Sequence, residues 1–490
     1  MISPFSDLSK WLLTVCALIL ASSVSSSFAQ PISNEESRSA LCQILTKLHQ
    51  TKGAEVWPGF DPLEVPLVAK FSDGVFGFGD KSELQGWNPV VVQDCMLYQS
   101  PKNFNAPSSP LVMYFDVGGA KGFYFDLTIK DEITASLLSA VVHERFHRFQ
   151  FEHFSQNLDL LHSAFTDHLQ TPLVANVYAQ NKKLTTYLKS GDVNDLKDFL
   201  ALRSTLIGKH TGSSELWVTN QARFEGTATY VQLKAMQLIE AKFKWGYTKI
   251  WADTLVDDLS LSRGVDGMIK WRHYSVGGAL LQFLDSMSLD ESWKNTIQVQ
   301  PLISFHSLVL GKLEMKSTEI NRRSLAIRKS IEFKRLELQA GQDIRSYQSE
   351  IDVRYQELSS QKFVILVKGP KKIACSGGGF SQRTYYLATG GRLDVGLTHM
   401  SQCSEGIPMF KETHRETQIL ESLVPNGSKF GADAVTWSAD GHVNQGMPEK
   451  PIQFQSFKLE TPTATIELNA PGIVHTVAGE LVVEARDSRD

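Results

Sequence analysis

The feature that most constrains the fold is the run KDEITASLLSAVVHERFHRFQFEHF, residues 130–154, which contains neither Gly nor Pro. Apolar residues recur through it and nothing interrupts its backbone hydrogen bonding, so it predicts one long helix, which Thr128 or Asp131 can cap. Two strand-like runs, LVMYFDV and GFYFDLTI, precede it and are joined by a glycine-containing turn. Strands that lead into a long helix indicate an α+β domain.

The remaining patterns divide the chain of 490 residues, which is longer than one core usually organises. Residues 1–29 predict a signal peptide, because the apolar run WLLTVCALILA follows Lys10 and the stretch ending at Ala29 suits cleavage. That run is short for a membrane span, so we expect no transmembrane anchor after cleavage and a secreted or periplasmic protein. We expect a helical connector over residues 301–360 and, over 361–490, an all-β domain resembling a sandwich.

Cysteine use agrees with export. Cys16 is expected to leave with the signal peptide, which leaves an even number of cysteines for an oxidising compartment. We favour disulfides between Cys42 and Cys95 and between Cys375 and Cys403, because each pair falls within one apparent domain. The formal charge of -4 gives no electrostatic reason to expect nucleic acid as a partner.

The long helix carries the sequence HERFH, an HExxH motif. His143 and His147 are four residues apart and therefore share a helix face, so both imidazoles can reach one cation, while Glu144 can act as a general base. This pattern predicts a zinc site, and the alternative is an ordinary polar helix face.

A catalytic zinc usually needs a third protein ligand. His153 nearly completes the spacing HExxHxxGxxH, but Gln150 replaces the glycine, and an unbroken helix turns His153 away from the metal. Glu225, on a second predicted helix, is the better candidate, and the small residues that follow it, Gly226 among them, would let this helix approach the first. The alternative is that Glu225 is an exposed helix residue. The other acidic candidates are Glu152, Asp159, Asp167 and Glu215.

With HERFH at 143–147 and EGTATY from Glu225, residues 110–285 resemble the thermolysin-like gluzincins, which are zinc peptidases. The resemblance implies a zincin-like catalytic domain over residues 30–300, made of a mixed sheet and a helical half. It implies His143, His147 and Glu225 as Zn²⁺ ligands and Glu144 as the base. The chain departs from the family at Thr229, where thermolysin-like members have an acidic residue, so the support for the first histidine must come from elsewhere.

The segment WRHYSVGGALLQFLD offers Tyr274 as a donor to a developing oxyanion, or as an aromatic residue packed under a helix. Its neighbour Arg272 could hold a substrate carboxylate or pair with an acid. The strand GFYFDLTI could border the cleft as an edge strand or lie inside the sheet. We therefore expect an exported zinc-dependent peptidase acting on a peptide or protein. The alternatives are a non-catalytic binding protein on the same scaffold and a zinc hydrolase acting on a non-peptide bond.

Overall fold

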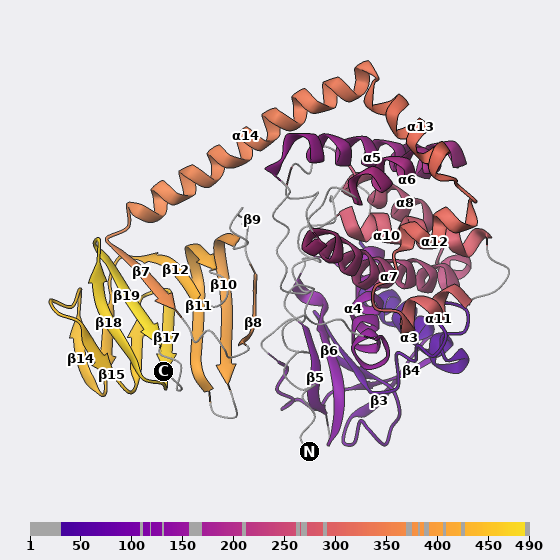
Figure 1. The fold of residues 1–490 in the computed structure, drawn as a ribbon. Helices are drawn as coiled ribbons and strands as arrows, with labels where there is room; N and C mark the ends of the chain where they lie inside the picture. The colour runs from indigo at the N-terminus through magenta and orange to yellow at the C-terminus, as the bar shows by residue number, and fades with distance from the viewer. Residues whose placement is uncertain are drawn as a thin grey trace. The chain divides into compact units, whose positions relative to one another are not determined.

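The computed structural model describes most of the chain from Pro31 to Ala485. The chain forms two compact units, and the boundary between them in the sequence falls between Ala340 and Gly341, inside helix α14 (Ile331–Ser359). The described residues are 31–107, 111–117, 119–129, 132–155, 169–207, 212–260, 265, 272–287, 292–368, 375–380, 383–386, 392–404, 408–422 and 427–485. The expected signal peptide lies outside them. The chain is mixed α/β with a β-rich C-terminal part, as the sequence predicted (Figure 1).

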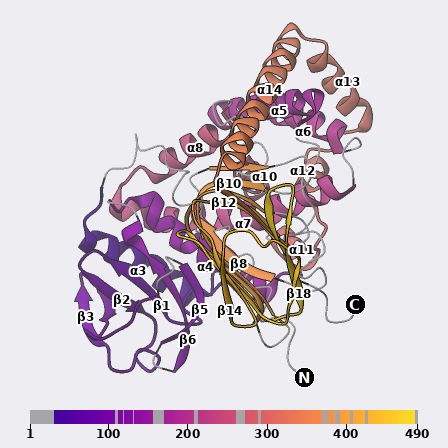
Figure 2. The ribbon, with the colours of Figure 1, turned by 90° about the vertical axis from the view of Figure 1, so that its left-hand side faces the viewer.

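The first unit begins with helix α3 (Asn34–Thr51), which lies beside a six-stranded sheet (Figure 2). The sheet has the order β3-β4-β2-β1-β6-β5. Its strands are β1 (Leu67–Phe71), β2 (Gly74–Phe78), β3 (Asn88–Val92), β4 (Cys95–Gln99), β5 (Leu111–Val117) and β6 (Ala120–Asp126). The predicted disulfide between Cys42 of α3 and Cys95 of β4 is present and ties the helix to the sheet.

The strand run GFYFDLTI forms most of β6, which lies inside the sheet. β6 pairs in parallel with β1 and antiparallel with β5, so the edge position belongs to β5. The β5–β6 register shifts between Val112 and Phe115. Of the two positions that the sequence left open for this strand, the structure selects the interior one.

The rest of the first unit is helical. Its helices are α4 (Ala135–His153), α5 (Thr171–Ser190), α6 (Val193–Ile207), α7 (Gly212–Phe243), α8 (Tyr247–Asp258), α10 (Arg272–Met287), α11 (Ser292–Val299), α12 (Phe305–Lys312), α13 (Ser317–Arg328) and the start of α14. Helix α7 packs against both α4 and α10 (Figure 1). Helix α7 therefore lies between α4 and α10 and sets their positions relative to each other.

Helix α4 begins later than the sequence suggested. Its N-cap is Thr134, whose hydroxyl accepts a hydrogen bond from the Leu137 amide at 3.2 Å. The predicted cap Thr128 belongs instead to a short 3-10 turn, Leu127–Ile129, where both its amide and its hydroxyl donate to Asp126. Thr128 is therefore already committed and cannot cap α4. The other predicted cap, Asp131, lies outside the described residues.

Two glycines bring α7 and α10 into backbone contact. A Cβ atom added to Gly277 of α10 would lie 2.5 Å from the Gly226 Cα and 2.7 Å from the Ala222 carbonyl oxygen. Because real Cβ atoms do not approach backbone atoms so closely, this crossing requires glycine. Gly226 was expected to allow approach to the first helix; it faces α10 instead.

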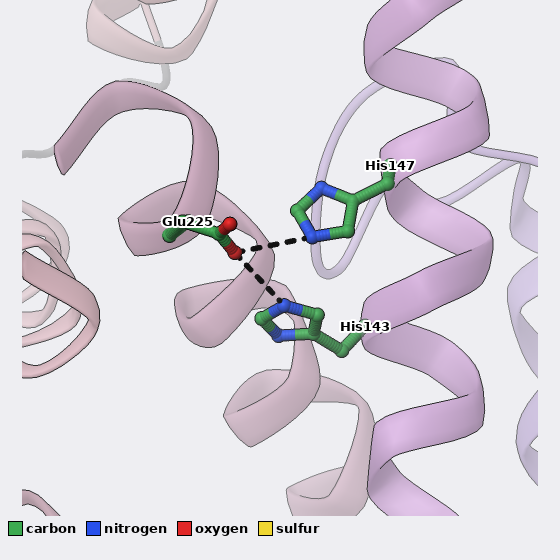
Figure 3. Close-up of side chains that lie close together, drawn as sticks. All are labelled: His143, His147 and Glu225. Carbon is green, nitrogen blue, oxygen red and sulfur yellow. Dashed lines mark ion pairs between the residues drawn. The ribbon is translucent and has the colours of Figure 1, made fainter. Parts of the chain in front are cut away.

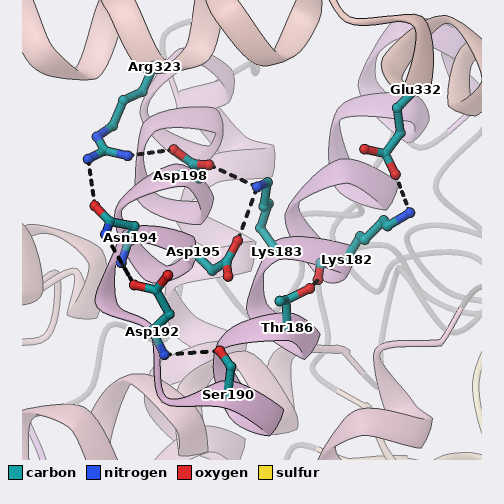
Figure 4. A network of polar contacts seen from close by, with 10 residues as sticks. All are labelled: Lys182, Lys183, Thr186, Ser190, Asp192, Asn194, Asp195, Asp198, Arg323 and Glu332. Atoms are coloured by element: carbon teal, nitrogen blue, oxygen red, sulfur yellow. Dashed lines mark hydrogen bonds and ion pairs between the residues drawn. The ribbon is translucent and has the colours of Figure 1, made fainter.

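Charged residues fasten α13 to the helices that follow α4 (Figure 4). Arg323 of α13 donates to Asp198 of α6 at 2.8 Å, and Lys183 of α5 approaches the other Asp198 oxygen at 2.9 Å. Lys183 also donates to Asp195 at 3.1 Å. Asp198 therefore links three helices at one point of this partly buried network.

The second unit contains one 13-stranded sheet. Its strands are β7 (Phe363–Lys368), β8 (Cys375–Phe380), β9 (Arg383–Tyr386), β10 (Arg392–Ser404), β11 (Pro408–Ser422), β12 (Gly427–Ala432), β13 (Thr436–Ala439), β14 (His442–Gln445), β15 (Ile452–Phe454), β16 (Phe457–Glu460), β17 (Ala464–Leu468), β18 (Gly472–Val477) and β19 (Glu480–Ala485). Strands from both ends of the sheet share one core, where Phe454 of β15 lies 5.0 Å from Phe457 of β16 between ring centroids. The part of the sheet that carries these strands therefore curls around one shared core.

Cys375 and Cys403 stand directly opposite each other on the paired strands β8 and β10. Their side chains lie outside those that the structure describes, so the second disulfide stays a prediction. Among the described residues, none of the helices combines the length and the apolar character needed to cross a bilayer.

Candidate metal centre

Three side chains from two helices converge in the interior of the first unit. His143 and His147 project from α4 and Glu225 from α7 (Figure 3). The Oε2 atom of Glu225 lies 3.4 Å from the Nε2 atom of His143 and 3.2 Å from that of His147. All three side chains are at most 3 % exposed. This buried group could hold a metal ion.

The spacing of these atoms suits a small tetrahedral cation. Ligand atoms that each lie about 2.0–2.1 Å from a tetrahedral zinc are about 3.3 Å apart from one another. The two measured distances between nitrogen and oxygen, 3.4 and 3.2 Å, agree with that value. These two distances therefore need little change for such an ion to be accepted.

A directed chain of hydrogen bonds fixes the ring of His143. The Ser139 hydroxyl donates to the Ser136 carbonyl at 2.7 Å, so it must accept the 2.6 Å bond from the Gln232 amide nitrogen. The Gln232 carbonyl oxygen therefore faces the Nδ1 atom of His143, at 3.1 Å. An oxygen can only accept there, so Nδ1 carries a proton, and in the neutral ring Nε2 keeps its lone pair.

A second chain fixes the ring of His147 in the same way. The Gln150 amide nitrogen donates to the Phe224 carbonyl at 2.8 Å and to the Thr227 hydroxyl at 2.5 Å. That hydroxyl in turn donates to the Arg223 carbonyl at 2.6 Å. The Gln150 carbonyl oxygen is thereby aimed at the Nδ1 atom of His147, at 2.6 Å. Both histidines thus present a bare Nε2 atom toward Glu225.

The electrostatics of this arrangement favour a cation. Burial alone would raise the pKa of Glu225, but the rings of His147 and His143 hold that pKa well below its usual range, so the group is a carboxylate. Burial lowers the pKa of His143, whereas for His147 the effect of burial is outweighed by the Glu225 carboxylate, which raises its pKa. Neither Nε2 atom has a hydrogen-bond partner among the described residues. When both rings are neutral, two lone pairs and a carboxylate oxygen face one another, and a positive charge between them, either a proton or a metal ion, removes the repulsion.

The predicted catalytic residues lie beside this group. The Glu144 side chain is 1 % exposed, and its carboxylate adds to the rise in the pKa of His147. The ring of Tyr274 from α10 stacks on that of His143, with 5.9 Å between the ring centroids and 10° between the planes. The ring of Phe224 stacks on that of His147, with 4.2 Å between the centroids and 5° between the planes. The structure thus gathers all five residues that the sequence assigned to the site.

The competing ligand candidates are elsewhere or outside the described residues. The ring of His153 packs against that of Phe149, with 4.4 Å between the ring centroids and 36° between the planes. Glu152 accepts hydrogen bonds from Arg148 and Tyr114. With Glu64, these two residues form a separate, exposed group of possible ligands. Asp159, Asp167 and the Glu215 side chain are not described.

Arg272 is held by two amide side chains of helix α5. It is 3 % exposed and donates to the side-chain oxygens of Asn181 and Gln180, each at 3.0 Å. Burial and the nearby Arg203 lower the pKa of Arg272 to about 9. Both of these partners are neutral amides of α5, so Arg272 helps to join α10 to α5.

Sequence reasoning missed Gln150 and Gln232. Gln150 was noted merely as the residue that replaces a glycine, and Gln232 was not considered. A usable signal was present, because Gln232 follows Glu225 by two helical turns and therefore lies on the same face of α7. The support that Thr229 cannot give to His143 comes from Gln232. Thr229 instead packs against α10, where its methyl group lies 2.8 Å from a Cβ atom built on Gly278.

Comparison of the chain with protein-family models, with curated proteins and with solved structures gave no match. Any functional assignment therefore stands on the site itself.

Proposed function

We propose that the chain is an exported zinc-dependent peptidase with a zincin-like catalytic domain of gluzincin type. The observation that carries this proposal is a buried group of three possible ligand atoms. The Nε2 atoms of His143 and His147 lie 3.4 and 3.2 Å from one carboxylate oxygen of Glu225, and oriented amides hold both rings. In this proposal His143, His147 and Glu225 hold Zn²⁺. Two imidazoles and one carboxylate are a ligand set of catalytic zinc sites, which keep the fourth position for water or substrate.

The neighbouring residues supply the rest of the chemistry. Zinc bound at these ligands would polarise a scissile carbonyl and lower the pKa of an attacking water to about 7. Glu144 accepts the proton of that water and delivers it to the leaving amine, which is the role of the glutamate in HExxH. The Tyr274 hydroxyl donates to the oxygen that gains negative charge. Peptide-bond hydrolysis then consumes one water and needs no other reactant.

The presence of Glu144 favours a catalyst over a binding protein on the same scaffold. Binding requires the three ligands alone, whereas a carboxylate buried beside them costs free energy that a binding protein would have no reason to retain. These residues do not distinguish the type of bond that is cleaved, because a zinc hydrolase of non-peptide bonds would use the same ones. A peptide substrate is proposed because HExxH with a later glutamate resembles the gluzincin peptidases.

The test combines metal content with turnover. The mature protein, purified without chelator or added metal, is expected to contain about one zinc per chain by elemental mass spectrometry. It should cleave a library of internally quenched peptides. Glu144→Gln should keep the zinc and lose on the order of 10²–10⁴-fold in turnover. Glu225→Ala should lose the zinc.

Glu337→Gln provides the matched control, because Glu337 is exposed on α14 and the change should alter neither quantity. Protein that contains no zinc and takes up none on titration would refute the metal site. Protein that binds zinc but turns over equally well with Gln at position 144 would refute the mechanism.

A further inference from the structure

We infer that Gln232 and Gln150 are positioning residues that set the metal affinity of this site, and that the neutral amide at Gln232 holds this affinity below what the same ligands could reach. The inference rests on the metal site proposed above. It concerns the partners of the ligands rather than the ligands themselves.

The two amides are built into the core for this task. Gln150 is fully buried and Gln232 is 7 % exposed. Each uses its nitrogen to bind a fixed hydroxyl or carbonyl group and its oxygen to bind the Nδ1 atom of a metal-binding histidine. The Phe224 carbonyl can only accept, so it prevents the Gln150 amide from turning over. The Gln232 amide is oriented by the Ser139 hydroxyl, which donates to the Ser136 carbonyl and accepts from the Gln232 nitrogen. With the amides in these orientations, each imidazole is held in the form whose Nε2 atom can bind a metal.

The chemical nature of the partner should tune the ligand. A carboxylate accepts a hydrogen bond from an imidazole more strongly than a neutral amide does, and it makes the opposite nitrogen a better metal ligand. In this chain both partners are neutral. The cation is therefore expected to bind less tightly, and to withdraw more electron density from whatever occupies its remaining position, than with a carboxylate partner.

The surroundings of the two amides differ in a way that makes the inference testable. The nitrogen of Gln232 faces the Ser139 hydroxyl, which can rotate and donate to an oxygen. The nitrogen of Gln150 faces the Phe224 carbonyl, which can only accept. Gln232→Glu is therefore compatible with its site, whereas Gln150→Glu places a carboxylate oxygen against a carbonyl oxygen.

The experiment measures zinc dissociation constants of the full-length mature chain by competition with a chromophoric chelator. Gln232→Glu should bind zinc more tightly than the wild type and Gln232→Leu more weakly, each by about 10–100-fold. Gln150→Glu should weaken binding. Gln237→Glu is the matched control, since it makes the same charge change at an exposed position of the same helix and should leave the constant unchanged.

A purely structural role for Gln232 predicts the opposite sign for the first variant, because an added buried carboxylate would disturb the core. The visible spectrum of each Co²⁺-loaded variant should match that of the wild type if the ligand geometry is kept. If Gln232→Glu binds zinc no more tightly than the wild type, the inference is wrong even though the metal site stands. If the wild type takes up no zinc, the proposed function and the inference are both overturned.

Discussion

The contact between the two helix backbones at Gly226 and Gly277 should make Gly277→Ala clearly destabilising. The new Cβ atom would lie 2.5 Å from the Gly226 Cα and 2.7 Å from the Ala222 oxygen. Non-bonded carbon atoms rest about 3.5–4.0 Å apart, so α10 and α7 must separate by about 1 Å. Overpacking costs about 1–3 kcal/mol, and the upper end applies because both contacted groups are backbone.

The higher helix propensity of alanine offsets part of this destabilisation. Alanine is favoured over glycine inside a helix by about 1 kcal/mol, which leaves a net loss of about 2 kcal/mol. For a unit of this size we expect the melting temperature to fall by roughly 4 °C. Zinc affinity should fall as well, because Glu225 adjoins Gly226 and moves with it.

Differential scanning calorimetry of the full chain, with and without zinc, measures the first effect, and chelator competition measures the second. Gly311→Ala is the control: Gly311 also lies in a helix, but a Cβ atom added there meets nothing within 4 Å. This change should leave stability equal or slightly raised. If Gly277→Ala is as stable as Gly311→Ala, the backbone contact does not exist as described and the reasoning fails.

Three further predictions concern other parts of the first unit. Tyr274→Phe should keep the zinc and the stacking on His143 but lower turnover on a quenched peptide by about 10²–10³-fold; unchanged turnover would exclude the oxyanion role. Burial, together with a nearby arginine, lowers the pKa of His306 to about 4, so protonation costs stability as the pH falls from about 6.5 toward 4. Urea unfolding at several pH values should show a loss of up to about 3 kcal/mol, and a slope that His306→Gln leaves unchanged would contradict this origin. Arg323→Met should remove about 1 kcal/mol at low ionic strength and less in 1 M NaCl, since its pairing with Asp198 is partly exposed; a difference that salt does not reduce would point to lost packing instead.

The sequence was sufficient where one short-range rule acts alone. His143 and His147 share a face because a helix without Gly or Pro repeats every 3.6 residues, and this needs no knowledge of the rest of the chain. The change from helical to strand-like patterns near residue 360 likewise follows from local composition, and the β-rich region begins at Phe363. Glu225 was found because its helix was recognisable and its carboxylate chemistry was required.

The sequence was insufficient where two segments compete for one group. Thr128 has the chemistry of a helix cap, but Asp126 binds it first, and no pattern reveals that competition. Gly226 is small toward any neighbour, so its partner depends on which helix lies on that side of α7. Gln150 is three residues from His147, but its amide is oriented by the Phe224 carbonyl of another helix. Gln232 lies 89 residues from the histidine that it binds, and only folding brings the two together.

If the site binds zinc as proposed, the separation of the ligands along the chain would link metal supply to the lifetime of the folded protein. An unfolded chain offers the two histidines of one short segment, whereas the complete set exists only after α4 and α7 have packed together. An ion that binds the folded form alone adds RT ln(1 + [L]/Kd) to its stability, about 2.7 kcal/mol when the free ion is at 100 times its Kd. Copies that fold where zinc is scarce would unfold more often and be degraded sooner, so the amount of this protein would follow the zinc available in the compartment where it folds.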